Sequence, residues 1–274
     1  MSDFIGTKLT MNLGERSYDI ILKNGALENL YQFARLDRRV AVVTDSGVPA
    51  QYAQRVADQC REARIITVPQ GEASKSFKIL ESVLQQMLDF NMGRGDLVVA
   101  VGGGVVGDLA GFAASIYMRG IDFINCPTTT LSMIDSSIGG KTAVDLGDTK
   151  NIVGAFWQPK LVIVDPDTLA TLPRRHYING LAEAVKASLL ADPELFGIFE
   201  KGDIDGQINE IIYRSLRFKK NIVEQDETER GMRKALNFGH TIGHGIEAVK
   251  GIKGRRTVGL FHGECVALGM LPMI

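Results

Sequence analysis

Short apolar runs alternate with amphipathic segments along the first half of the chain. The β-branched runs 39–45 and 63–69 are bounded by turn residues and predict strands, whereas segment 74–90 carries apolar residues at helical spacing. We predict further strands at 96–103, 122–128 and 160–166, and an antiparallel hairpin at the sheet edge over 11–25. Continuous apolar strands separated by helices are typical of a parallel α/β sheet with both faces covered.

The pattern changes after Pro173, where helical periodicity replaces the apolar runs. Segments 178–192, 193–201, 206–227 and 233–250 are all helical in pattern, and no strong strand signal follows residue 165. We therefore predict a parallel-rich α/β domain over 1–174 and an all-α domain over 175–274. Functional sites often lie in the cleft between two such domains.

Charge and cysteine content narrow the classes of function. Lys and Arg total 31 against 32 Asp and Glu, which argues against a general nucleic-acid or membrane-surface binder. The three cysteines are far apart and form no CxxC pair, which favours a reducing compartment, and the first residues show no signal-peptide pattern. We expect a cytoplasmic protein. Segment 97–118 is as long as a membrane span, but its glycines and Asp108 predict a buried strand, a glycine turn and a helix.

Two glycine-containing motifs suggest contact with phosphate groups. Gly102, Gly104 and Gly107 satisfy G-x-G-x-x-G between a predicted strand and a predicted helix, where a pyrophosphate could approach the backbone. The only acid near the spacing expected for ribose binding, Asp122, precedes its strand instead of ending it and is not convincing, so a nucleotide site and a plain tight turn remain equal alternatives. The triplet Gly140-Lys141-Thr142 resembles a P-loop, but Asp135 stands where that motif needs glycine, which disfavours a classical ATPase.

Histidines gather near the end of the chain. His240 and His244 are four residues apart and would share one helix face, and His262 follows within the same region. Such a set could bind a metal together with a carboxylate, could transfer protons, or could simply be packed. Acidic candidates are Glu183, Glu247 and Glu264, and spacing alone does not decide among these roles.

Several basic residues stand among glycine, small polar or acidic residues instead of in charge runs. Each one alone would most often be a solvated surface residue. Together with a possible nucleotide turn and a possible metal cluster, they indicate an enzyme that binds an anionic small molecule. These residues are Arg119, Lys141, Lys150, Lys186, Lys219 and Arg233.

Read together, the motifs resemble the 3-dehydroquinate synthase family of the sugar phosphate cyclase superfamily. The matching stretches run in order from about residue 69 to 273 and include "VGGGVVGDLAGFAASIYMRGIDF", "DSSIGGKTAVD", "NGLAEAVK", "LNFGHTIGHGIE" and "HGECVALGM". The resemblance implies an α/β nucleotide-binding domain followed by a helical domain. It also implies NAD, a divalent metal (zinc, with cobalt as an alternative) and a homodimer. The implied reaction converts 3-deoxy-D-arabino-heptulosonate 7-phosphate to 3-dehydroquinate and phosphate in the shikimate pathway.

The resemblance also implies roles for individual residues. The metal ligands would be Glu183, His240 and His262, whereas His244 would contact substrate and assist proton transfer. The rest of the substrate site would be Lys141, Lys186, Asp135, Asn151, Lys219, Arg233 and Asn237, with Arg119 reaching in from a neighbouring subunit. The NAD site would be Asp45, Glu72, Lys75, Gly103, Gly104, Val105, Asp108, Thr128 and Thr129, with Lys141 and Lys150 touching both ligands.

The implied chemistry is a transient oxidation by NAD, elimination of phosphate, reduction, and intramolecular aldol closure. Two departures from the family pattern stand out: the connection between Glu247 and His262 is longer than usual, and the chain stops just after His262, which predicts an incomplete helical domain. Two alternatives therefore remain. The chain could be an inactive fragment that still binds cofactor, or a metal-dependent NAD alcohol dehydrogenase that accumulates NADH.

Overall fold

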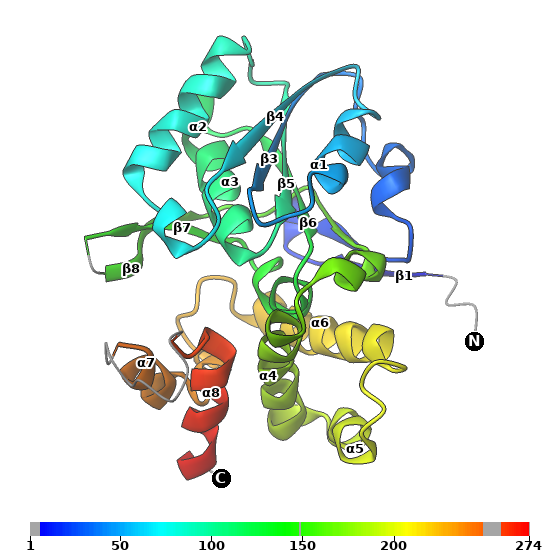
Figure 1. Cartoon of the computed structure of the whole chain (residues 1–274), viewed down its shortest axis with the longest axis vertical. Helices are drawn as coiled ribbons and strands as arrows, with labels where there is room; N and C mark the ends of the chain where they lie inside the picture. Colours follow the sequence, from blue (N-terminus) through cyan, green and yellow to red (C-terminus); the bar gives the residue numbers. More distant parts are fainter. Residues whose placement is uncertain (1–5, 148, 249–258, 274) are drawn as a thin grey trace.

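The computed structural model describes residues 6–147, 149–248 and 259–273, and it confirms the predicted fold class. Figure 1 shows a sheet-containing half above a group of helices. Seven strands form one sheet in the order β1-β2-β9-β6-β5-β3-β4, in which only the edge pair β1–β2 is antiparallel. The strands are β1 Thr7–Met11, β2 Tyr18–Leu22, β3 Arg39–Asp45, β4 Glu62–Val68, β5 Leu97–Gly102, β6 Asp122–Pro127 and β9 Leu161–Val164.

Helices cover both faces of this sheet because its central strands are apolar on both sides. Helix α2 (Phe77–Asp89) and helix α3 (Gly104–Ile116) pack on one face with Val43, Val98 and Phe123. Helix α1 (Ala50–Ala57) packs on the other face with Val42, Val99 and Ile163. The stretch 97–118 is thus a buried strand followed by a helix, as predicted. Every helix among the described residues is too short or too polar to span a bilayer.

The predicted strands all form. An antiparallel hairpin also forms at the sheet edge, but its first strand ends at Met11, so that strand lies almost entirely before the predicted segment 11–25 and only the second strand falls inside it. A second hairpin, β7 (Lys141–Leu146) with β8 (Thr149–Phe156), was not predicted. Strand β8 is mostly exposed, with only Val153 and Ala155 half-buried, so it lacks the apolar run that marks the other strands. Strand β7 packs beside α3 through the buried Val144. The hairpin carries Lys141, Lys150 and Asn151.

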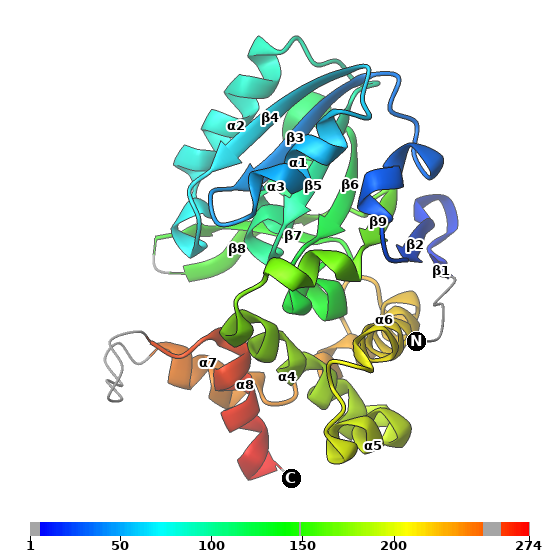
Figure 2. The ribbon, with the colours of Figure 1, turned by 45° about the vertical axis from the view of Figure 1, so that its right-hand side comes forward.

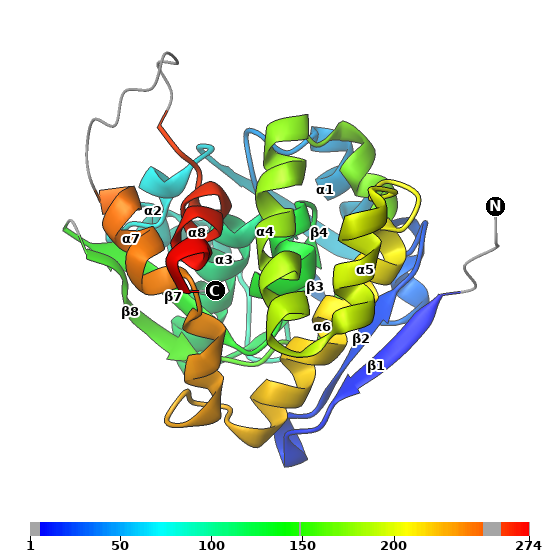
Figure 3. The ribbon, with the colours of Figure 1, turned by 90° about the horizontal axis from the view of Figure 1, so that it is seen from below.

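Five helices make up the second half, and Figure 2 shows them below the sheet. They are α4 Arg174–Ala191, α5 Pro193–Lys201, α6 Ile208–Gln225, α7 His240–Ala248 and α8 His262–Met270. Seen from below in Figure 3, α4 lies between the α7–α8 pair and the α5–α6 pair. Most of the predicted long connection between Glu247 and His262 lies outside the described residues.

One hydrophobic core joins the two halves of the chain. Ile20 of β2 and Val162 of β9 belong to the same buried cluster as Ala184 of α4 and Ile212 of α6. The helices of the second half begin at Arg174, where the periodicity changes, but residues on both sides of this position belong to the same buried cluster. The domain boundary at 174 therefore stays a prediction.

Candidate active site

Helix α4 holds one side of the candidate site. Gly180 lets this helix approach the backbone closely, because an added Cβ would lie 2.2 Å from the nitrogen of Leu131. That contact places Glu183 and Lys186, on the following turns, beside the short π-helical segment Ser132–Ser136 that carries Asp135. Glu183 and Lys186 are both buried and form an ion pair with each other. A buried carboxylate and a buried ammonium thus face the same space.

Three of the predicted side chains converge at the metal position. His240 opens α7 and His262 opens α8, and their Nε2 atoms lie 3.6 and 3.9 Å from Oε1 of Glu183. The ring centroids of His240 and His262 are 5.3 Å apart. Each of the three residues offers one ligand atom, and these three atoms all lie within 4.8 Å of one another. This is the spacing of groups that surround one ion.

The chemistry of these donors fits a divalent metal. Both carboxylate oxygens of Glu183 are buried; Oε2 pairs with the ammonium group of Lys186, and Oε1 accepts no hydrogen bond from the described residues. Burial, together with the charge of Lys186, lowers the pKa of His240 and favours the neutral imidazole that binds metals. Two histidine nitrogens and one carboxylate oxygen are a common protein set at catalytic zinc, with a position left for substrate or water.

The N-terminus of α8, and with it His262, is fixed by α4. The Asn179 side-chain oxygen accepts hydrogen bonds from the backbone nitrogens of Gly263 at 2.7 Å and Glu264 at 3.3 Å. Gly263 allows this approach because an added Cβ would lie 2.0 Å from the Asn179 carbonyl oxygen. Arg175 pairs with both carboxylate oxygens of Glu264 at 2.7 Å and stacks over Phe261. One helix therefore supplies a ligand and holds another in place.

A pair of opposite charges, the buried Lys219 and the half-buried Asp135, lies next to the candidate metal position. Lys219 of α6 contacts the Asp135 carboxylate at 2.9 Å and donates to its backbone carbonyl at 2.7 Å. Burial alone would raise the pKa of Asp135, but Lys219 and Lys186 outweigh it and the pKa falls below its usual range. Burial lowers the pKa of Lys219, whereas the contact with Asp135 acts in the opposite direction.

Arg233 reaches the same region from the turn before α7. It is 1% exposed, and its guanidinium donates to the carbonyl oxygens of Gly139, at 3.0 Å, and Glu227. Gly139 has φ +93°, and an added Cβ would lie 2.5 Å from a guanidinium nitrogen. A side chain at residue 139 would therefore displace Arg233. Burial lowers the pKa of Arg233 from that of a free guanidinium.

The more exposed predicted residues pair with two acids, Glu229 and Glu247. Lys141 contacts Glu229, which also accepts a hydrogen bond of 3.3 Å from Asn237. Lys150 lies 2.6 Å from Glu247. Glu229 was not predicted, because it stands in a polar loop without periodicity and no local signal marks it. Glu247 was an acidic candidate because it stands near the histidines in sequence, but its contact with Lys150 was not predicted.

The predicted nucleotide side lies at the carboxyl ends of β3, β5 and β6. Gly103, Gly104 and Val105 form the turn into α3 and are partly exposed, whereas the next two residues are buried. An added Cβ on Gly104 would lie 3.0 Å from Ser136 Oγ, which shows how narrow the turn is. Thr128 and Thr129 follow β6, and Asp45 ends β3, where its carboxylate accepts hydrogen bonds from two backbone nitrogens. The open backbone at a helix N-terminus suits a pyrophosphate.

Lys75 connects the nucleotide side with the substrate side. Its ammonium group contacts Asp108 at 2.6 Å, Glu72 at 3.8 Å and the side-chain oxygen of Asn151. Burial raises the pKa of Asp108 to about 6, with Lys75 acting in the opposite direction. The two predicted ligand sites therefore share one hydrogen-bond network centred on the buried Lys75.

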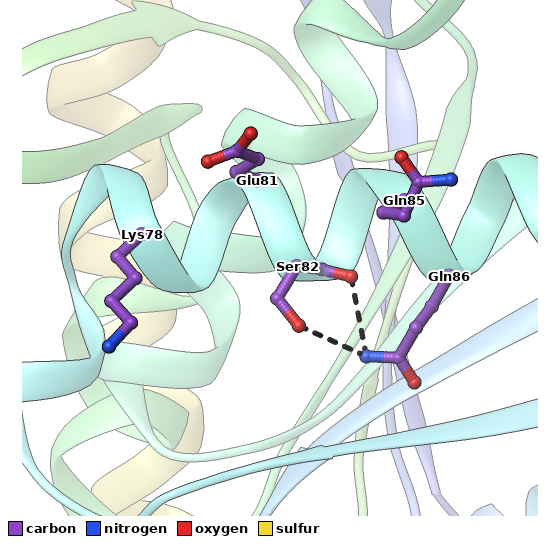
Figure 4. Close-up of a pocket in the computed structure, with 5 residues that line it drawn as sticks. All are labelled: Lys78, Glu81, Ser82, Gln85 and Gln86. Atoms are coloured by element: carbon purple, nitrogen blue, oxygen red, sulfur yellow. Dashed lines mark hydrogen bonds between the residues drawn. The ribbon is translucent and has the colours of Figure 1, made fainter.

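Two features lie apart from this cluster. Arg119 is exposed at the turn after α3 and has no ion pair with the cluster in the described part of the chain. Lys141 begins a strand and not a helix, so the Gly140-Lys141-Thr142 triplet is no P-loop. A shallow hollow on α2 is lined by residues outside the predicted site (Figure 4): Lys78, Glu81, Ser82, Gln85 and Gln86.

Comparison with known proteins identifies the family. The family described as 3-dehydroquinate synthase N-terminal matches residues 65–179, and 3-dehydroquinate synthase C-terminal matches residues 180–273. A 3-dehydroquinate synthase from Pelobacter propionicus is 42% identical over 96% of this chain and 76% of its own length.

Solved structures agree with this match. A 2-deoxy-scyllo-inosose synthase complexed with carbaglucose-6-phosphate, NAD+ and Co2+ has a TM-score of 0.84 at 27% identity, over 96% of this chain and 73% of that one. The 2-epi-5-epi-valiolone synthase of Streptomyces hygroscopicus, with NAD+ and Zn2+ bound, has a TM-score of 0.81 at 30% identity, over 94% and 74%. The chain belongs to the 3-dehydroquinate synthase family.

Proposed function

We propose that this chain converts 3-deoxy-D-arabino-heptulosonate 7-phosphate to 3-dehydroquinate and phosphate, as a carbon–oxygen lyase that uses NAD and a divalent metal. The observation that carries the proposal is the convergence of Glu183, His240 and His262 beside the Asp135–Lys219 ion pair. The relatives' names and the cofactors in the solved structures support it.

The metal would be held by Glu183, His240 and His262, and when bound it would act as a Lewis acid toward substrate oxygens. We favour zinc because two imidazoles and one carboxylate suit it, and cobalt fits the same donors. NAD would lie on the turn at Gly103 and Gly104, where it would supply reversible hydride acceptance.

The basic residues would bind and orient the substrate. Lys141 and Lys150 are accessible and now face carboxylates, so a phosphate or carboxylate of the substrate could take the place of Glu229 or Glu247. Three of the basic side chains are buried, those of Lys186, Lys219 and Arg233. Because they are already ordered, they would not need to change conformation to bind substrate. Asn151 and Asn237 offer amide groups beside them.

His244 is placed for proton transfer. Its ring centroid lies 5.4 Å from that of His240 and 5.6 Å from that of His262, but its side chain is 59% exposed. An exposed imidazole next to the metal position can exchange protons with both solvent and substrate. The two histidines on one face of α7 would thus do different work.

We also propose a cytoplasmic homodimer in which Arg119 enters the partner's site. Ile116 and Met118 are each 43% exposed beside Arg119, which leaves an apolar surface near that arginine. Subunit mixing tests this assembly. Arg119→Ala and His240→Ala should each be inactive alone and should regain part of the activity when mixed, because mixed dimers would contain one complete site. Failure to recover activity in demonstrated mixed dimers would contradict it.

The decisive experiment measures phosphate release from the heptulosonate phosphate with NAD and zinc. Release that needs both additions, stops with a chelator and leaves no net NADH would support the synthase. Net NADH from a simple alcohol without phosphate release would favour an alcohol dehydrogenase. A folded, metal-loaded chain that releases no phosphate would contradict the proposal and support the inactive fragment.

A further inference from the structure

Glu247 was an acidic candidate near the histidines but is not one of the implied metal ligands, and it contacts three predicted site residues. On α7, its Oε2 is 3.5 Å from Nδ1 of His262 and 3.3 Å from Nδ1 of His244. Its Oε1 accepts a hydrogen bond of 2.6 Å from Lys150 of β8. One carboxylate thus links the start of α8, the helix face of α7 and the hairpin strand β8.

The two ring nitrogens of His262 face two different carboxylates. Nε2 lies 3.9 Å from Glu183 Oε1, and Nδ1 lies 3.5 Å from Glu247 Oε2. A neutral imidazole carries one proton, and a carboxylate beside Nδ1 holds the proton there. The lone pair of Nε2 then points to the side where Glu183 and His240 lie.

We propose that Glu247 is a positioning residue that fixes the ring orientation and the tautomer of His262 for metal binding. This inference rests on the proposed metal site. A carboxylate that accepts a hydrogen bond from a ligating histidine strengthens that ligand, and its loss typically weakens metal binding by about 10–100-fold. Through Lys150, the same carboxylate ties the ligand's orientation to a residue that would touch substrate.

An alternative is that Glu247 is itself a ligand of a second ion, together with His244 and His262. Ligand atoms of these three residues also lie within 4.8 Å of one another. The environment favours the positioning role, because both Glu247 oxygens already have partners, one of them an ammonium group. Glu183 Oε1, in contrast, is buried and accepts no hydrogen bond from the described residues, and Lys186 pairs only with Oε2.

Metal affinity of the full chain tests the inference directly. Metal-stripped wild type, Glu247→Gln and Glu247→Ala would be titrated with Zn²⁺ against a chromophoric chelator. We expect Glu247→Ala to bind about 10–100-fold more weakly. We expect a smaller loss for Glu247→Gln, whose amide oxygen can still accept from Nδ1. The melting temperature of each metal-free variant would show that the fold is retained.

A matched control separates the loss of charge from the loss of positioning. Glu81→Gln removes the same charge from the exposed face of α2 and should keep wild-type zinc affinity. In ¹⁵N-labelled, zinc-loaded protein, a slowly exchanging Nδ1 proton on His262 should be seen in the wild type and be absent in Glu247→Ala.

The outcomes distinguish the inference from the proposal on which it rests. Wild-type affinity in Glu247→Ala would overturn the positioning role and leave the metal site intact. A fall from two bound ions to one would make Glu247 a ligand and would also overturn it. If the wild type itself bound no metal, the proposed metal site would fail, and the inference with it.

Discussion

The nucleotide side of the candidate site is built from backbone, whereas the metal side is built from side chains of separate helices. Gly103 and Gly104 form a turn between consecutive elements, β5 and α3. Glu183, His240 and His262 come from three helices and meet only because α4, α7 and α8 pack together. A backbone turn follows from local sequence, but the metal side depends on contacts between distant residues. The two sides should therefore respond differently to substitution.

The strongest test of this contrast is His240→Ala. The variant loses one of three metal donors, so we expect loss of bound zinc and a fall in turnover of roughly a thousandfold or more, since Lewis-acid stabilisation is worth several kcal/mol. Metal content and phosphate release measure the two effects. Because His240 is not part of the apolar core, its metal-free melting temperature should stay near that of the wild type. Unchanged metal stoichiometry would show that the ligand assignment is wrong.

Lys219→Met should be the most destabilising of the substitutions considered. Asp135 would keep a charge without its main partner; because its side chain is 31% exposed, we expect the loss to fall below the roughly 3–5 kcal/mol typical of a fully buried pair. Chemical denaturation measures the loss in the free energy of unfolding. The double variant Asp135→Asn/Lys219→Met should lose less than the two single variants together. Strict additivity would mean that the pair does not contribute as a unit.

On the nucleotide side, Gly104→Ala should leave the stability of the fold unchanged and weaken the binding of NAD. The added Cβ would meet only the end of the Ser136 side chain, at 3.0 Å, which can turn away. It would also occupy the narrow turn where a pyrophosphate would approach, so we expect a loss in NAD affinity of about tenfold, or ~1.4 kcal/mol. Calorimetric titration with NAD gives the affinity, and zinc binding serves as the control. A loss of zinc binding of the same size would contradict the separation of the two sides.

The smallest expected effect concerns the loop that leads to Arg233. Backbone nitrogens of Arg230, Gly231 and Arg233 donate to Asp226 and lower the pKa of its carboxyl. A lowered pKa in the folded protein means stabilisation that is present at neutral pH and is lost as pH falls through the folded-state pKa. Asp226→Asn should therefore melt slightly below the wild type at pH 7, and the difference should shrink below about pH 4. A difference in melting temperature that grows as the pH falls below about 4 would contradict this prediction.

The sequence predicted what local patterns determine. The β5 strand, its glycine turn and α3 are adjacent in sequence and apolar, so their order and type could be read directly. The β7–β8 hairpin could not, because β8 is mostly exposed and is defined by pairing with β7. In the site, the metal donors followed from the family resemblance. The contacts of Glu247 with Lys150 and of Glu229 with Lys141 join residues far apart in sequence, which periodicity cannot connect.

The shared core described above has a consequence for exchanging parts between related cyclases. The first two strands, although they open the chain, pack with the helices: Asn12 bonds Glu224, and Arg16 pairs with Glu227. The Tyr18 hydroxyl also accepts from the backbone nitrogen of Gly139, next to the buried Arg233. A chimera joined only at residue 174 would pair a foreign hairpin with native helices. A graft that carries residues 6–22 together with the helices would keep these contacts. Two separate stretches of sequence should therefore be exchanged together.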